Sequence, residues 1–225
     1  MKPELTARLQ CVASYVREGD IVADIGTDHA LLPIYLIKTE ICRKVYASDI
    51  RSGPLETARK YLKYFGVYDG CIELIKSDGF LQIPNNYSTA VIAGMGGETI
   101  SAILNRANMS TGRRYILQPM SKPERLRNYL YQNGFFIDDE TIVQEQDRFY
   151  TIIVANPGQC LYEPVDIYAS KKLRCKKDSV TKAYLNKILS VRQQVLQAKC
   201  GRVDPCVYKQ EFEFHEYLLK KFSED

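Results

Sequence analysis

The sequence contains no tryptophan, only two histidines, and no Cys-x-x-Cys pair among its seven cysteines. A zinc site needs a cluster of such ligands, so we expect no metal centre. No apolar run reaches the roughly 18 residues of a transmembrane helix. The N-terminus also lacks the apolar core of a signal peptide. We therefore expect a cytoplasmic protein with reduced, mostly structural cysteines.

Net charge and chain length limit the possible partners and the number of domains. A net charge of +4 is too small to indicate a nucleic-acid partner by itself. With 225 residues and a hydrophobic content of 45%, the chain is long enough for one medium domain and an appendage. The composition changes after Pro157-Gly158. We predict a catalytic domain over residues 1–158 and a helical domain over residues 159–225.

Strand-like and helix-like patterns alternate through the first of these domains, which predicts an α/β fold with a largely parallel sheet. The predicted strands are 21–25, 44–48, 72–76, 89–93, 113–117, 135–143 and 148–154, and the predicted helices are 5–16, 30–39, 54–65, 97–106 and 122–132. The last two strands form a hairpin. Ser121 is the predicted N-cap of the helix that follows it. In the second domain, two amphipathic helices predict a short antiparallel, coiled-coil-like hairpin.

The most informative segment is the first turn between strand and helix. The apolar run 21–25 ends at Gly26, which permits a tight turn and the close approach of a ligand. Asp28 follows where a dinucleotide-binding loop would have glycine, and its charge would repel a pyrophosphate. A nucleoside that carries a sulfonium fits this electrostatic environment better than a nicotinamide dinucleotide. Asp49, at the end of the next strand, is placed to bind the two ribose hydroxyls.

Two further strands end in similar loops, Ser77-Asp78-Gly79 and Gly94-Met95-Gly96-Gly97. Any one of these segments alone is equally explained as a plain turn. Four polar or glycine-rich loops at successive strand ends indicate a ligand site, because open α/β sheets bind ligands at the carboxyl edge of their strands.

The motifs D-I-G-T-D-H-A-L-L-P, S-D-G-F, A-G-M-G-G and Y-I-L-Q-P together resemble the bacterial tRNA (adenine-22, N1)-methyltransferase family, also called TrmK. The resemblance covers nearly the whole chain. It implies a Rossmann-like class I methyltransferase sheet, S-adenosyl-L-methionine as cofactor and methylation of tRNA at adenine 22. Met120 departs from the family pattern, in which a polar residue, often Asn, is expected.

On this basis we predict which residues form the site. Cofactor binding is assigned to Asp24, Gly26, Thr27, His29, Asp49, Ser77, Asp78, Gly79, Gly94, Met95, Gly96 and Gly97. Asp28 is the catalytic candidate, since a carboxylate near N1 would stabilise the cationic product; the alternative is that it caps a helix. His29 is as well explained by a hydrogen bond to the backbone of the 94–97 loop as by contact with substrate.

Substrate binding is predicted at two places. Gln118 and Pro119 follow a strand on the binding edge, and Tyr150 offers a ring on which a base can stack. Residues 171–202 contain ten Lys or Arg and a single acid, Asp178, which suits a helix lying along RNA phosphates. The predicted contacts in this segment are Lys171, Lys172, Arg174, Lys176 and Lys177. The alternative is a solvated helix face.

Other functions remain open at this point. A methyltransferase of the same fold can act on a small molecule or a protein, because a fold does not fix a substrate. A non-catalytic nucleotide- or RNA-binding module is the second alternative. A nicotinamide-dependent dehydrogenase is the least favoured. We expect tRNA as the partner, no membrane or metal, and a monomer.

Overall fold

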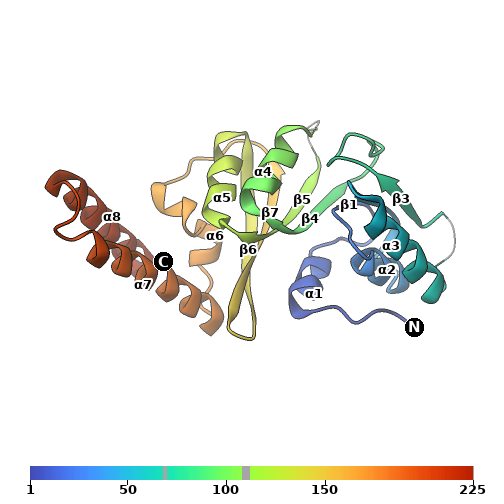
Figure 1. Cartoon of the computed structure of the whole chain (residues 1–225), viewed down its shortest axis with the longest axis horizontal. Helices are drawn as coiled ribbons and strands as arrows, with labels where there is room; N and C mark the ends of the chain where they lie inside the picture. Colours follow the sequence, from blue (N-terminus) through green and yellow to red (C-terminus); the bar gives the residue numbers. More distant parts are fainter. Residues whose placement is uncertain (68–69, 108–111, 225) are drawn as a thin grey trace. The chain divides into compact units, whose positions relative to one another are not determined.

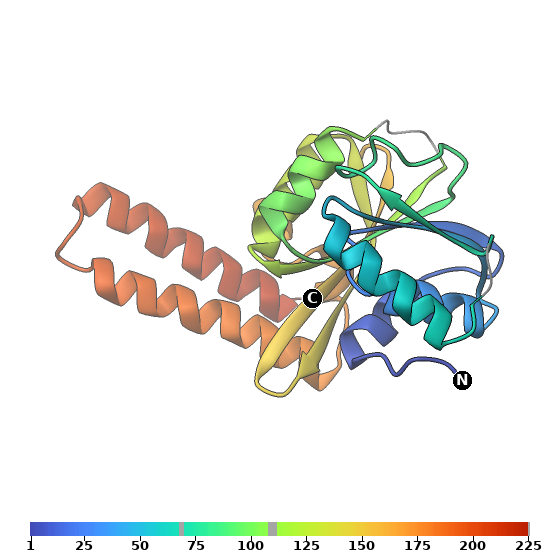
Figure 2. The same ribbon diagram turned by 45° about the vertical axis from the view of Figure 1, so that its right-hand side comes forward.

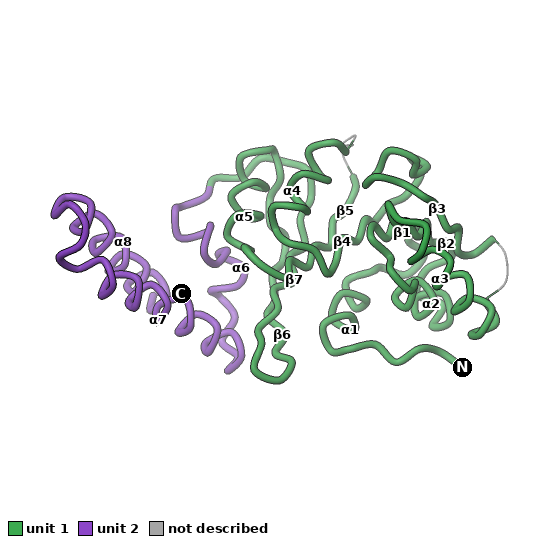
Figure 3. Tube along the Cα trace, in the orientation of Figure 1, with its two compact units in different colours: residues 1–161 green, residues 162–225 purple. Residues whose placement is uncertain are grey.

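The computed structural model describes residues 1–67, 70–107 and 112–224. They fall into two compact units, Met1–Leu161 and Tyr162–Asp225 (Figure 3). The first is called unit 1 and the second unit 2. The boundary lies three residues after the one that the sequence predicted.

In the described part of unit 1, seven strands form one sheet (Figure 1). The strands are β1 (Asp20–Ile25), β2 (Cys42–Asp49), β3 (Ile72–Lys76), β4 (Thr89–Gly96), β5 (Arg114–Ser121), β6 (Phe135–Glu145) and β7 (Arg148–Pro157). Their order across the sheet is β3-β2-β1-β4-β5-β7-β6. The first five pair in parallel, whereas β7 pairs antiparallel with both β5 and β6. The predicted Rossmann-like fold is confirmed.

Both faces of this sheet are buried. The helices of unit 1 are α1 (Ala7–Ser14), α2 (Leu31–Lys38), α3 (Ser52–Tyr64), α4 (Gly97–Asn105) and α5 (Pro123–Gln132). Neighbouring strand residues point to opposite faces. Val22 therefore packs with α1 to α3, while Ala23 packs with α4 and α5. The two groups of helices cover opposite faces of the sheet (Figure 2). The predicted elements all occur, and most strands extend a few residues beyond the predicted ends.

One predicted cap is wrong. Ser121 is still part of β5, where it pairs with Gly96, so its side chain does not cap the next helix. The N-cap of α5 is Lys122, which turns the chain through a left-handed conformation with φ of 53°. The glycine stops behave as expected, because Gly66 and Gly134 follow the ends of α3 and α5 with positive φ.

Unit 2 contains a short 3-10 helix η1 (Pro164–Ile167) and the helices α6 (Lys171–Arg174), α7 (Ser179–Lys199) and α8 (Pro205–Glu224). Helices α7 and α8 pack against each other as the predicted hairpin. The basic segment is not one helix, because the chain leaves α6 after Arg174. Asp178, the acid within that segment, accepts a hydrogen bond from the Thr181 N–H and caps α7.

A buried ion pair fixes α5 against β6. The Arg127 guanidinium donates from Nε and Nη2 to Glu140 Oε1, at 2.8 and 2.6 Å, and both side chains are fully buried. Burying two charges is expensive, so their mutual attraction has to offset a large desolvation cost.

We predict that Glu140→Leu lowers the free energy of unfolding by about 3–5 kcal/mol, because it leaves the Arg127 charge buried without this partner. Urea denaturation measures the loss. The double variant Arg127→Met with Glu140→Leu should recover part of it, since no buried charge remains. If the double variant loses as much free energy of unfolding as Arg127→Met and Glu140→Leu lose together, the two side chains are not coupled as assigned.

Candidate active site

The topology of the sheet indicates where a ligand should bind. Strand order reverses between β1 and β4, and ligands of open α/β sheets bind at such a switch point, outside the carboxyl ends of the strands. A cavity of about 460 Å³ lies there, and a second of about 390 Å³ adjoins it near the end of β3. Gly26, Asp49, Arg51 and Met95 line both, so the two form one cleft.

Gly26 shapes the floor of this cleft. Its φ of +77° is one that residues with a Cβ rarely adopt, and a Cβ at this position would lie 2.1 Å from Met95 Cε. The N–H groups of Gly26 and Thr27 both donate to the Ser48 carbonyl at 2.8 Å. The turn after β1 is thereby tied to the end of β2.

Two buried carboxylates face the cleft from these strand ends. Asp24 lies on β1 and Asp49 on β2. Burial raises the pKa of Asp24 to about 6, the Thr27 hydroxyl opposes that rise, and the nearby charge of Asp49 adds to it. Asp49 also accepts a hydrogen bond from the Arg51 N–H at 2.9 Å. A cleft with this acidic floor favours a cationic ligand over an anionic one.

Asp28 and His29 form the rim of the cleft. Asp28 has φ of +53°, a conformation that Asp tolerates better than most residues. Its side chain is 64% exposed, and Oδ2 lies 3.6 Å from His29 Nε2. The alternative helix-capping role is not observed, because Ala30 is the N-cap of α2 and no side chain caps it. The His29 ring stacks on Tyr61 of α3, and neither of its nitrogens bonds the 94–97 backbone.

The cleft gathers most of the predicted cofactor residues. Asp24, Gly26, Thr27, His29, Asp49, Gly94 and Met95 line the larger part, and Ser77, Asp78 and Gly79 line the smaller part. Asp78 also pairs with Arg106 at 2.7 Å. Gly96 and Gly97 line neither part. Gly97 serves packing, because a Cβ there would lie 2.4 Å from the Lys122 carbonyl oxygen.

The predicted substrate residues on β5 and β7 take a supporting position. Gln118 is fully buried; its Oε1 accepts from Arg8 Nη1 at 2.6 Å and from the Gly94 N–H at 3.0 Å. It therefore holds the cleft wall and does not line the cavity. Pro119 does not line it either. Tyr150 lies beneath the Arg8 guanidinium, whose Cζ is 5.3 Å from the ring centre.

Sequence reasoning missed Arg8, which lines the cleft from the N-terminal helix α1. No local pattern marks it, because its place beside Gly94 arises only when α1 packs across the sheet. Met120 also lines the cleft, and its Sδ lies 3.5 Å from Arg8 Nη1. Met120 thus forms part of the wall at a position where the family pattern led us to expect a polar group.

The basic residues of unit 2 divide into two kinds. Lys171, Lys172 and Lys177 are exposed, and Lys176 is half-buried. Arg174 is buried, and its Nη1 donates to Asp166 Oδ1 at 2.8 Å and to the Ala169 carbonyl at 2.7 Å. The prediction that Arg174 contacts substrate is therefore wrong, because this side chain is used to hold unit 2 together.

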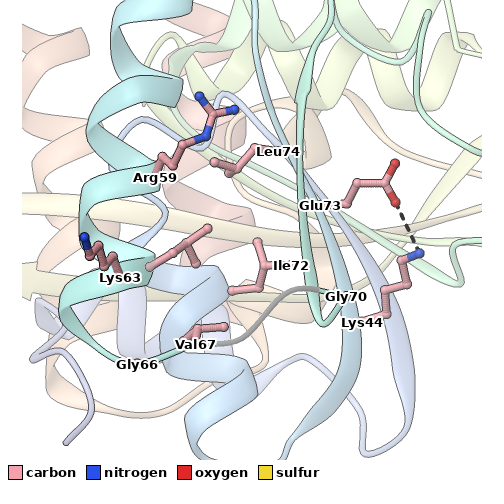
Figure 4. A pocket seen from close by; sticks show the side chains of 10 residues that line it. Lys44, Arg59, Lys63, Gly66, Val67, Gly70, Ile72, Glu73 and Leu74 are labelled. Atoms are coloured by element: carbon pink, nitrogen blue, oxygen red, sulfur yellow. Dashed lines mark ion pairs between the residues drawn. The ribbon is translucent and has the colours of Figure 1, made fainter.

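A larger cavity, of about 620 Å³, lies away from this edge, between α3 and β3 (Figure 4). Its floor is apolar, and Arg59 and Lys63 stand on its α3 side. Lys44 pairs with Glu73 at 3.2 Å. Among the described residues that line this cavity, Glu73 is the single acid, whereas several carboxylates converge at the switch point, so size alone does not make it the active site.

The described residues include no group of three or more His, Cys, Asp or Glu that could hold a metal ion. Within the same ranges, no helix combines the length and the apolar composition needed to cross a bilayer.

Five of the seven cysteines are exposed, so the structural role expected for most of them fits only Cys11 and Cys42.

Comparison with known proteins identifies the family to which the chain belongs. The model of a family described as a methyltransferase domain matches residues 5–153. The chain belongs to this methyltransferase family. It is 35% identical over 158 residues to the tRNA (adenine(22)-N(1))-methyltransferase of Bacillus subtilis, an alignment that spans 69% of this chain and 66%, just under two thirds, of that relative.

Solved structures cover nearly the whole methyltransferase. The B. subtilis M1A22 tRNA methyltransferase TrmK superposes with a TM-score of 0.86 at 28% identity, covering 97% of this chain and 98% of the other. TrmK of M. capricolum, in complex with S-adenosyl-homocysteine, gives 0.82 at 28% identity, with coverage of 97% and 98%. The family resemblance inferred from the motifs is confirmed.

The raised pKa of Asp24 yields a prediction about stability. Between the ordinary value near 3.8 and the folded value of about 6, the folded protein binds more protons than the unfolded chain. The free energy of unfolding of the wild type, relative to that of Asp24→Asn, should therefore fall as pH rises from about 4 to 6. The change should be on the order of 1–3 kcal/mol and should level off about one pH unit above the folded pKa.

Chemical denaturation at several pH values measures this difference, and Asp147→Asn in the exposed β6–β7 turn is the matched control. A difference between wild type and Asp24→Asn that stays constant from pH 4 to 7 would show that folding does not raise the pKa of the Asp24 carboxyl.

Proposed function

We propose that this protein transfers a methyl group from S-adenosyl-L-methionine to N1 of adenine 22 in tRNA. The observation that carries the proposal is the cleft at the strand switch point, which brings buried acids, a glycine floor and Asp28 together. The whole-length likeness to TrmK structures supports the choice of reaction.

The residues of the cleft fit this cofactor. S-adenosyl-L-methionine supplies a methyl group attached to a positively charged sulfur. Asp49 offers a buried carboxylate for ribose hydroxyls, and Asp24 adds negative charge beneath the cationic part of the ligand. Gly26 and Gly94 leave the backbone bare where the ligand has to approach closely. The Met95 methyl group lies against Gly26, and this flexible side chain has to move aside when the cofactor binds.

Adenine N1 carries a free lone pair at neutral pH, so no base has to remove a proton before it attacks. The protein's tasks are to align donor and acceptor and to exclude water. N1 lies on the Watson–Crick edge, and the base therefore has to leave its stack to enter the cleft.

Methylation at N1 places a positive charge on the base. The exposed Asp28 carboxylate, on the rim beside His29, is placed to stabilise that charge or to accept a proton from the exocyclic amine. Arg8 lines the same cleft beside Gln118 and Met120, on the β5 side.

Unit 2 supplies the second part of the proposal. Lys171, Lys172 and Lys177 are exposed, with no carboxylate within ion-pair distance among the described residues. Such cations bind phosphates and release counterions. Residues 159–225 therefore serve as a tRNA-docking domain, with Arg174 as a structural support and not as a contact.

The wild-type protein, incubated with methyl-labelled S-adenosyl-L-methionine and bulk bacterial tRNA, should place label in 1-methyladenosine. Asp28→Asn should lower kcat by about a hundredfold or more, because the neutral amide cannot offset the product charge. The affinity for the cofactor should stay within a few-fold, measured by calorimetry with S-adenosyl-homocysteine. Loss of cofactor binding in Asp28→Asn would assign Asp28 a structural role. Label only in protein or a small molecule would replace tRNA as the substrate.

The triple variant Lys171→Glu, Lys172→Glu and Lys177→Glu should weaken tRNA binding about tenfold or more at moderate salt, since three phosphate contacts become repulsive. Filter binding over a salt series measures this effect. The control is Lys209→Glu on α8, where the lysine faces Glu213. Equal tRNA affinity for the triple variant and the control would remove these lysines from the RNA contact.

A further inference from the structure

Helix α3 carries an exposed row of aromatic and basic side chains. Tyr64 lies four positions after Lys60 and three positions after Tyr61, so its side chain neighbours both on the helix surface. Tyr61 is 37% exposed and Tyr64 is 70% exposed. Aromatic residues are enriched at interfaces relative to the rest of a protein surface, and a group of exposed aromatic side chains often marks an interaction site. We call Lys60, Tyr61 and Tyr64 the α3 stripe.

The α3 stripe begins at the active-site cleft. The Tyr61 ring stacks on His29, with ring centres 5.7 Å apart and an angle of 14° between the planes. His29 lines the cleft, and its side chain is 44% exposed. A base that stacks on this pair would therefore lie beside the rim that carries Asp28.

Phe65 packs against both tyrosines. Phe65 packs edge-on against Tyr64, with centres 5.0 Å apart, and lies 6.3 Å from Tyr61. Rings that are already fixed lose little conformational freedom when a ligand binds. Helix α3 runs across the front of unit 1 in the view of Figure 2. Both tyrosines are exposed to solvent.

The charge around the α3 stripe is positive. Arg51 precedes the helix and Arg59, Lys60 and Lys63 lie on it, whereas Glu56 is the only acid from residue 51 to residue 64. Arg59, Lys60 and Lys63 make no ion pair with any described residue. Arg59 and Lys63 project from the flank of α3 (Figure 4). Phosphate groups of a nucleic acid complement these cations, and its bases can stack on the open rings.

We propose that the α3 stripe and His29 bind the RNA strand next to the target nucleotide, with bases stacked on the rings and phosphates beside the cations. The inference rests on the proposed function and names the face of unit 1 that carries the substrate. A nucleotide that leaves its helix breaks stacking on both sides, and exposed aromatic rings replace part of what is lost. Single-stranded RNA sites combine these two elements, rings for bases and cations for the backbone.

The test uses the full chain and a labelled tRNA transcript in fluorescence anisotropy. Tyr61→Leu with Tyr64→Leu should weaken tRNA binding about tenfold or more, because stacking is lost while apolar bulk is kept. Tyr61→Phe with Tyr64→Phe keeps the rings and should bind within about twofold of wild type. Lys60→Glu should weaken binding and reduce the slope of affinity against salt by about one. Arg43→Glu, an exposed charge at the opposite edge of the sheet, is the matched control and should bind as the wild type does.

Cofactor affinity separates the explanations. Calorimetry with S-adenosyl-homocysteine should give values within about twofold of wild type for every variant. Wild-type tRNA affinity in the leucine pair and in Lys60→Glu would overturn the α3 stripe as an RNA surface. A parallel loss of cofactor affinity would overturn it too, since Tyr61 would then act by holding His29. A wild-type protein that neither binds nor methylates tRNA would instead refute the proposed function itself.

Discussion

The parallel pairing of β1 with both β2 and β4 is the constraint on which the site depends. It brings three carboxyl ends to one edge, and the reversal of strand order opens a crevice between β1 and β4. The Gly26 turn then has to pass close to Met95, and two hydrogen bonds to the Ser48 carbonyl fix its course. Any side chain at position 26 would narrow the cleft and strain the backbone.

Electrostatics decides what this cleft accepts. Asp24 and Asp49 are buried at its floor and Asp28 is exposed at its rim, so a cationic ligand is favoured and a pyrophosphate is opposed. Arg8 adds a cation on the wall, where Gln118 accepts its hydrogen bond and the Tyr150 ring lies beside it. Gln118 joins both halves of the site, since the same oxygen accepts from Arg8 and from the Gly94 backbone.

The strand ends were the part of the site that sequence could predict. Asp24, Asp49 and Asp78 each follow an apolar run, and parallel topology brings such ends together whatever the side-chain details. Residues outside this rule were harder to place. Gly97 resembled a ligand-binding glycine but lies where α4 meets the Lys122 carbonyl. Arg174 resembled a phosphate contact, yet its guanidinium is buried against Asp166, which sequence spacing does not reveal.

The sequence by itself determined the alternation of strands and helices, the acidic turn after β1 and the family. Local patterns suffice for these features, because periodicity and turn residues act over a few positions. Only the tertiary structure decided that Arg8 of α1 lines the cleft and that Tyr61 of α3 stacks on His29 at its rim. It also decided that Gln118 supports the wall instead of facing the cavity. Those placements depend on how helices pack across a sheet, and long-range packing leaves no mark in the local sequence pattern.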